Sequence, residues 1–197
     1  MSKGLATRQR IVDQAVALTR VAGLEGLSIG HLAELTGLSK AGLFRHFGSK
    51  TGLQQAVLEA CVDEFRARVI VPALRAPTGL ARLTLLLDTW LDWTEAADCD
   101  GGCPLLGASI ELDDQPGELR TYLVEKQRAW LDCIRAAAAR AVAEGDLRAE
   151  LDIEQFAFEF NSIGLGFNFA HRLLDDTAAA TRARTALARL VAANATA

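Results

Sequence analysis

Basic and aromatic side chains gather in residues 38–50, "LSKAGLFRHFGSK", which hold three cations and a histidine. Lys40, Arg45 and Lys50 carry the charge, and His46 adds an imidazole whose ring nitrogens can form hydrogen bonds. Cationic side chains and the unpaired amides at a helix N-terminus suit phosphate oxygens and the acceptor-rich edges of bases. The chemistry that this segment favours is therefore recognition of a polyanion.

Catalytic and metal-binding chemistry has weaker candidates in this chain. The carboxylates of "IELDDQPGE", residues 110–118, have no histidine near them in sequence, and no phosphate-cradling glycine loop occurs. We therefore expect no enzyme, no catalytic residue and no cofactor. Cys99 and Cys103 stand four residues apart without a nearby histidine, which falls short of a tetrahedral ligand set, so we expect no metal.

The same two thiols leave a redox alternative open. Cys103 directly precedes Pro104, which is favoured at the first position of a helix, so its sulfur would face a helix N-terminus, where thiolate is stabilised. Cys99 would then be the resolving partner. A buried N-cap thiol in a loop explains the same residues, and Asp98 and Asp100 oppose thiolate formation.

The charge is distributed unevenly over 197 residues, half of which are hydrophobic and whose net charge is −4. Residues 1–60 carry seven cations against four anions, a net of +3, which leaves −7 for the remainder. A basic N-terminal segment on an acidic body indicates that the segment meets a polyanion. We see neither a signal core nor an uncharged apolar run of membrane-spanning length, and we expect a cytoplasmic protein with reduced thiols and no membrane partner.

The helix-forming composition predicts an all-α fold, because Ala, Leu, Arg and Glu dominate and the four prolines all lie beyond residue 71. Capping residues and glycines divide the first 60 residues into helices. The expected N-caps are Thr7, Ser28, Ser39 and Ser49, and the expected terminating glycines are Gly23, Gly37 and Gly48. Two short helices joined around Gly37, with Leu43 and Phe47 facing inward from the second, make a helix-turn-helix.

Residues 28–53, "SIGHLAELTGLSKAGLFRHFGSKTGL", resemble the DNA-binding signature of the tetracycline-repressor (TetR) family of bacterial transcription regulators. The resemblance implies a helix-turn-helix DNA-binding domain over residues 1–60 and a helical effector-binding and dimerisation domain over residues 61–197. It also implies the DNA contacts: groove-facing Lys40, Ala41, Gly42, Phe44, Arg45 and His46, a phosphate contact from Lys50, and backbone contacts from Ser28, His31 and Ser39.

Two departures from the family pattern leave the bases that are read open. Phe44 stands where the family usually has tyrosine, and Gly42 stands where it often has threonine. Both changes remove a hydroxyl. Phe44 can still pack on a sugar or a thymine methyl, and Gly42 lets the backbone approach DNA closely.

The function that the resemblance implies is a ligand-responsive DNA-binding regulator, most often a repressor, with double-stranded DNA and a small-molecule effector as partners. A two-fold homodimer would present two reading helices to an inverted-repeat operator with half-sites ~34–36 Å apart or further. A non-DNA helical interaction module and an enzyme are remote alternatives. The salt dependence of binding distinguishes a DNA-binding regulator from a non-DNA module, because binding to an operator weakens steeply as the salt concentration rises.

Beyond residue 60, periodicity predicts helices near 80–97, 104–112, 118–144, after 152 and at 177–193. The segment after Asp152 is apolar on several faces, with Phe156, Phe160, Ile163 and Phe167 on one side and Phe158, Leu165 and Phe169 elsewhere. A partner subunit would cover the second side, and Gly164 and Gly166 would allow a close helix crossing. The family likeness implies a dimer interface built from the last two helices.

An effector pocket is expected among the aromatic residues of the body, since the rings outnumber what a bundle of this size needs. Core packing explains each ring equally well. The candidates are the rings of Trp90, Trp93, Phe156, Phe160 and Phe167, with Thr94, Cys103, Tyr122, Asn161 and His171 as polar groups. Such a pocket favours a small, hydrophobic effector.

Overall fold

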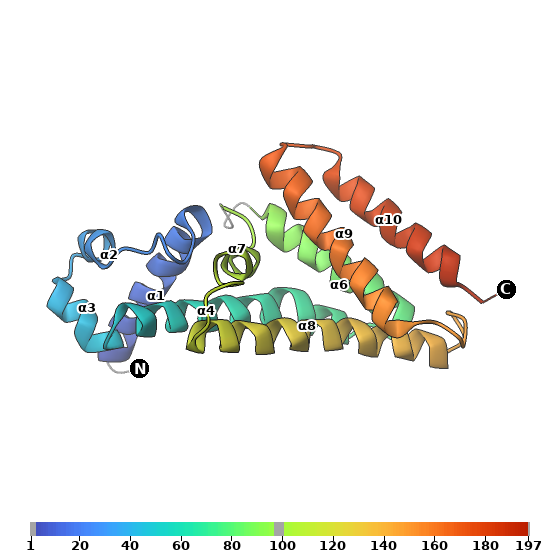
Figure 1. The fold of residues 1–197 in the computed structure, drawn as a ribbon, viewed down its shortest axis with the longest axis horizontal. Coiled ribbons are helices and arrows are strands. Elements are labelled where there is room, and N and C mark those ends of the chain that lie inside the picture. Colours follow the sequence, from blue (N-terminus) through green and yellow to red (C-terminus); the bar gives the residue numbers. More distant parts are fainter. Residues whose placement is uncertain (1–2, 97–100, 197) are drawn as a thin grey trace. The chain divides into compact units, whose positions relative to one another are not determined.

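The computed structural model describes residues 3–96 and 101–196. Within these ranges the chain is helical, with no strand beyond an isolated bridge between Leu147 and Ala195, so the all-α prediction is confirmed (Figure 1). The elements are α1 (Lys3–Ala22), α2 (Ile29–Thr36), α3 (Lys40–Phe47), α4 (Lys50–Phe65), the π-helical η1 (Arg66–Ile70), α5 (Val71–Leu74), α6 (Gly79–Glu95), α7 (Pro104–Glu111), α8 (Glu118–Ala143), α9 (Ile153–Leu173) and α10 (Ala179–Asn194).

The helices group into two compact units. We call residues 1–64 together with 97–125 the head unit, and residues 65–96 together with 126–197 the body unit. The helix α7 and the first two turns of α8 thus pack with α1 to α4. The division of DNA binding and effector binding at residue 60 concerns function and stays a prediction.

Capping side chains and glycines set the ends of the two short helices of the head unit. The Ser28 hydroxyl accepts from the His31 amide at the start of α2, and the Ser39 hydroxyl accepts from the Gly42 amide at the start of α3. Gly37 ends α2 in the left-handed conformation, with φ 67°, which favours glycine. The predicted helix-turn-helix is confirmed, together with its caps.

One predicted cap is wrong. Thr7 lies inside α1, which begins at Lys3. The segment before Thr7 is also helical, and it contains no proline, the residue that most strongly opposes a helix interior. The end of α1 is as predicted, since the helix stops before Gly23, whose φ is 76°.

The core of the head unit forms where the predicted inner positions meet. Ile11, Leu32, Leu43 and Leu53 are fully buried. The inward prediction for Phe47 is met in part, because its ring is half-buried and the Arg8 guanidinium of α1 lies 5.1 Å from its centroid. Burial of Leu43 anchors α3 and thereby fixes which of its side chains point outward.

A π-helical turn joins α4 and α5. In this turn the Val71 amide donates to the Arg66 carbonyl, five residues back. Pro72 follows, and a proline has no amide for the α-helical ladder and clashes with the carbonyl four residues earlier. The wider turn is a way to carry the chain past the proline without ending the helix.

The body unit is organised around α6, whose buried face holds Leu83, Leu86, Leu87, Trp90, Leu91, Trp93 and Thr94, as the periodicity predicts. Gly79 begins this helix against α8, where a Cβ would lie 2.3 Å from the Ala141 amide nitrogen. The Gly79 amide also donates to the Glu144 carboxylate at 2.6 Å, and this bond lowers the pKa of Glu144. The start of α6 thus packs closely on the backbone of α8 and is hydrogen-bonded to the Glu144 carboxylate directly after that helix.

The helices α9 and α10 lie side by side in the body unit (Figure 1). Phe156, Phe160 and Phe167 are buried, whereas Phe158 and Phe169 are 67% and 55% exposed, so the two predicted sides of α9 are confirmed. No helix within the described ranges has the length and the apolar character to cross a bilayer.

Gly164 serves a different contact from the one expected. A Cβ at Gly164 would lie 1.9 Å from Trp90, so this glycine makes room for an indole of its own chain, where the sequence suggested a crossing with a partner helix. Gly166 has no atom within 4 Å of its Cβ position and is exposed, so its role in a helix crossing stays a prediction.

Gly164→Ala should destabilise the body unit by about 1–3 kcal/mol, because the added methyl overlaps the Trp90 ring. Gly166→Ala, two residues along the same helix, is the matched control. It meets nothing within 4 Å, and alanine should leave stability unchanged or raise it by up to ~1 kcal/mol. Chemical denaturation of both variants checks this, and equal stability of the two would contradict the packing described here.

Candidate functional site

The outer face of α3 carries the residues that the sequence marks as DNA contacts. Lys40, Ala41, Phe44 and Arg45 are exposed, and Gly42 and His46 are partly exposed. Ser28, His31 and Ser39 are also exposed, at the starts of α2 and α3. Phe44 is 44% exposed, so its ring is accessible for a contact beside the charged side chains of the same helix. The predicted set lies at the surface of one helix-turn-helix, and its role as a DNA interface stays a prediction.

The helix N-termini on this surface suit an anion. In α3 the Ser39 hydroxyl accepts from the Gly42 amide, while the amides of Lys40 and Ala41 have no acceptor within the helix. A methyl group at Gly30 would stand 3.6 Å from Lys40 Cε and 3.7 Å from Lys40 Nζ, which places this side chain over the first turn of α2. An ammonium and exposed backbone amides here are the donors that bind phosphate oxygens.

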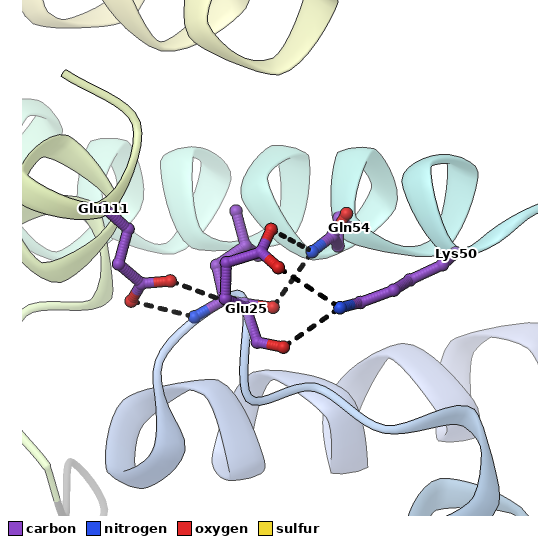
Figure 2. Close-up of polar contacts among 5 residues, drawn as sticks. Glu25, Lys50, Gln54 and Glu111 are labelled. Atoms are coloured by element: carbon purple, nitrogen blue, oxygen red, sulfur yellow. Dashed lines mark hydrogen bonds and ion pairs between the residues drawn. The ribbon is translucent and has the colours of Figure 1, made fainter. Parts of the chain in front are cut away.

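Lys50, the predicted phosphate contact, has a partner within the head unit. Its Nζ donates to the Glu25 carbonyl at 3.0 Å and pairs with Glu25 Oε2 at 3.3 Å (Figure 2). The Lys50 side chain is 43% exposed. An ammonium has three donors, so this pairing leaves one for a phosphate oxygen. The predicted phosphate contact is compatible with this geometry.

Three residues of this polar network are absent from the sequence-based set. Gln54 is buried, and its Nε2 donates to the Leu24 carbonyl at 3.0 Å and to Glu25 Oε1 at 3.3 Å. Glu111 accepts from the amides of Leu24 and Glu25 (Figure 2). Glu25 and Gln54 could have been found as polar residues on either side of the helix-turn-helix. Glu111 carries no such signal, because 86 residues separate it from Glu25.

The predicted effector residues fall into both compact units. The body unit holds Trp90, Trp93, Thr94, Phe156, Phe160, Asn161, Phe167 and His171. Cys103 and Tyr122 belong to the head unit, so a pocket that combines them with the others stays a prediction. The candidates in the body unit come from α6 and α9, which are neighbours.

A cluster of aromatic rings occupies the body unit. The Phe65 centroid lies 5.2 Å from that of Trp93 and 5.1 Å from that of Trp130, and the Trp90 and Trp130 centroids are 5.3 Å apart, all with edge-to-face geometry. Trp130 Nε1 donates to Asn161 Oδ1 at 2.9 Å. Sequence reasoning missed Phe65 and Trp130, although a search for every tryptophan would have found Trp130. Mutual packing accounts for these rings, and their part in effector binding stays a prediction.

The C-terminal part of α9 carries further hydrogen-bonding groups. The His171 ring stacks on Phe167 with centroids 5.3 Å apart, and its Nδ1 lies 3.9 Å from Glu95 Oε1. Asn168 Oδ1 is buried and has no hydrogen-bond partner among the described residues. A buried acceptor without a donor costs free energy, and a ligand with an N–H or O–H group would satisfy it.

The cysteines give the redox alternative no further support. Cys103 is the N-cap of α7 with Pro104 at the first helical position, as predicted, but Cys99 lies outside the described residues. Burial raises the pKa of the Cys61 thiol to about 12, despite the opposing effect of the Arg20 guanidinium. Burial also raises the pKa of Cys133. Within the described ranges no group of three His, Cys, Asp or Glu residues could hold a metal ion.

Comparisons with known proteins match both parts of the chain. Residues 11–57 match the family described as "Bacterial regulatory proteins, tetR family", and residues 79–187 match "Tetracyclin repressor-like, C-terminal domain". The chain is 30% identical over 158 residues to the probable HTH-type transcriptional regulator ArpR of Pseudomonas putida, which covers 77% of this chain and 73% of that protein.

Solved structures extend the likeness to the whole fold. A TetR transcriptional regulator from Chloroflexus aurantiacus aligns with a TM-score of 0.90 and 31% identity, covering 99% of this chain and 98% of that one. The regulator AibR, solved in complex with isovaleryl coenzyme A and operator DNA, shares the fold with a TM-score of 0.70 at 20% identity, covering 84% and 86%.

Cys61 should resist alkylation by iodoacetamide in the folded protein at about pH 8, because its raised pKa keeps it a neutral, buried thiol. The neutral form is favoured by folding, so the stability it contributes is full below the ordinary pKa of 9.0 and is lost as pH rises through about 12. Peptide mass mapping after labelling tests this, with denatured protein as the control that reacts fully. Rapid labelling of folded protein would contradict it.

Proposed function

The chain belongs to the tetracycline-repressor family of bacterial transcriptional regulators, and we propose that it acts as a dimeric repressor released from an inverted-repeat operator by a small apolar effector. DNA binding and ligand response are properties of the family. The repressor action, the residues that read DNA, the dimer and the effector class are our proposals. We place its action on DNA in the cytoplasm.

The observation that supports DNA reading best is the outward face of α3. Lys40 and Arg45 are both exposed on a helix anchored by the buried Leu43, and Ser39 caps its first turn. A helix held in this way can enter a major groove with its N-terminal residues toward the base edges. Arg45 is the strongest candidate for base contact, because a guanidinium can donate two parallel hydrogen bonds to guanine.

The exposed side of α9 supports a dimer. Phe158, Leu165, Phe169 and Leu173 recur at helical spacing on one face, and Phe158 and Leu173 are 67% and 68% exposed. A row of large exposed apolar side chains marks a protein interface in most soluble proteins. The family arrangement, in which the last two helices of each subunit pair, would place α9 and α10 there.

The effector site that we propose lies in the body unit, near the rings carried by α6 and α9. The buried Thr94, the partnerless Asn168 Oδ1 and the stacked His171 would supply the polar contacts. AibR, a protein of the same fold, binds isovaleryl coenzyme A, which is a precedent for an acyl ligand in this fold. A coupling of ~1–3 kcal/mol between effector and DNA would suffice for regulation.

Arg45→Ala should weaken operator binding by about 1–3 kcal/mol, roughly 5- to 150-fold in Kd, because it removes a bidentate base contact. Gel shifts on DNA upstream of the chain's own gene, run over a series of salt concentrations, measure this. Arg128→Ala, an exposed arginine of α8, is the control for loss of charge. Unchanged affinity of Arg45→Ala would show that another residue reads the DNA, and salt-independent binding by the wild type would refute recognition of a DNA backbone.

Phe158→Glu should weaken the dimer by at least about tenfold, since it places a charge in the apolar face of α9. Sedimentation equilibrium over a dilution series measures the dissociation constant. Leu74→Glu introduces the same charge at an apolar residue of α5 that is 50% exposed, and it should leave the dimer intact. A dimer equally stable in both variants would exclude this face of α9 from the interface.

A further inference from the structure

Glu111, the last residue of α7, binds the turn between α1 and α2 within the head unit. Its carboxylate accepts from the Leu24 amide at 3.1 Å and from the Glu25 amide at 2.7 Å (Figure 2). Two amides on one carboxylate are charge-assisted hydrogen bonds, which are stronger than those between neutral groups. A residue of α7 therefore holds a backbone turn that is distant from it in sequence and close to it in the folded head unit.

The contact of Glu111 with this turn requires a glycine at position 23, directly before the turn. Gly23 has φ 76°, and a Cβ there would lie 2.3 Å from Glu111 Oε1. Any other residue would be strained by the backbone conformation and would also displace the carboxylate. Only a glycine at the end of α1 leaves room for the Glu111 carboxylate. The contact is therefore specific and not an incidental approach of a surface carboxylate.

The same turn holds the start of α4. The amides of Leu24 and Glu25 bind Glu111, while their oxygens bind α4: the Leu24 carbonyl accepts from Gln54, and the carbonyl and carboxylate of Glu25 accept from Lys50. Gln54 is only 3% exposed, so this is not a solvated surface contact. The contacts thus connect Glu111 through the turn to Lys50, which is three residues after the end of α3.

A second attachment holds the segment before α7 on α1. Buried Arg20 donates to the Gly102 carbonyl at 3.2 Å and to Glu64 Oε2 at 2.6 Å. Gly101 has φ 98°, and a Cβ there would lie 1.9 Å from the Arg20 carbonyl oxygen. Residues 101–111 are therefore held at both ends. Gly101 and Gly102 contact Arg20 near the C-terminal end of α1, and Glu111 binds the turn after α1.

The geometry points to Glu111 as a positioning residue for DNA recognition, which acts through the Leu24–Glu25 turn on Lys50 and does not touch DNA. This inference rests on the proposed function. It makes a prediction opposite in sign to simple electrostatics. Removing an anion from a DNA-binding unit should tighten binding to a polyanion, whereas loss of Glu111 should weaken it, because the turn and Lys50 lose their fixed positions.

Glu111→Ala should weaken binding about tenfold, the effect expected of lost charge-assisted hydrogen bonds, and Glu111→Gln should fall between this variant and the wild type because it keeps one acceptor oxygen. The probe is the duplex that wild-type protein selects from a random-sequence library, and titration calorimetry gives Kd. Asp114→Ala removes the same charge from an exposed site three residues later and should not weaken binding. Circular dichroism with thermal melting confirms that each variant is folded.

A double-substitution cycle with Lys50→Ala tests the path. Both changes interrupt one chain of contacts, so the double variant should bind within about twofold of the weaker single variant. Glu111→Ala should also lower the salt slope by about one phosphate contact, as Lys50→Ala does. Amide hydrogen exchange should show lost protection at Leu24 and Glu25 in Glu111→Ala.

Several outcomes would overturn the inference. If Glu111→Ala binds DNA as tightly as the wild type or tighter, Glu111 is not a positioning residue. If the fold-change in Kd of the double variant equals the product of the two single fold-changes, the effect of Glu111 does not act through Lys50. Both leave the proposed function standing if the wild type selects an inverted repeat. A wild type that enriches no sequence would refute the proposed function, and this inference would fall with it.

Discussion

The left-handed turn at Gly37 is the constraint on which the DNA-reading surface depends. Its φ of 67° lets α2 end and α3 begin within three residues, and its amide donates to Glu34 while the Leu38 amide donates to Ala33. The small, buried Ala33 and the fully buried Leu43 then bring the two helices together. Because Leu43 cannot leave the core without a large cost, the outward direction of Lys40, Phe44 and Arg45 follows from packing.

In both units, segments approach each other so closely at certain glycines that no side chain larger than hydrogen fits there. In the body unit Gly79 admits the backbone of α8, and Gly164 admits the Trp90 ring. In the head unit Gly23 admits the Glu111 carboxylate. Each contact joins segments distant in sequence, and each leaves no room for a methyl group. The fold is therefore least tolerant of substitution at glycines within or directly after helices, where propensity alone would favour alanine.

Local features of this structure were predictable and distant ones were not. The caps at Ser28 and Ser39, the glycine ends and the two sides of α9 follow from residue type and helical period, which act over a few residues. Thr7 failed as a cap because a threonine can also stand within a helix. The partners of Glu111, Trp130 and Gly164 are set by the packing of helices, and no spacing in the sequence encodes them. Gly164 was rightly taken as a close-approach site, but its partner is Trp90.

The clustering of the indoles has a practical consequence. The chain has three tryptophans, and all of them, Trp90, Trp93 and Trp130, lie in the ring cluster of the body unit. The single tyrosine, Tyr122, belongs to the head unit. Intrinsic indole emission is therefore an optical signal of the body unit alone. Events that disturb its aromatic core can be followed without a label, and they are spectroscopically separate from changes confined to the head.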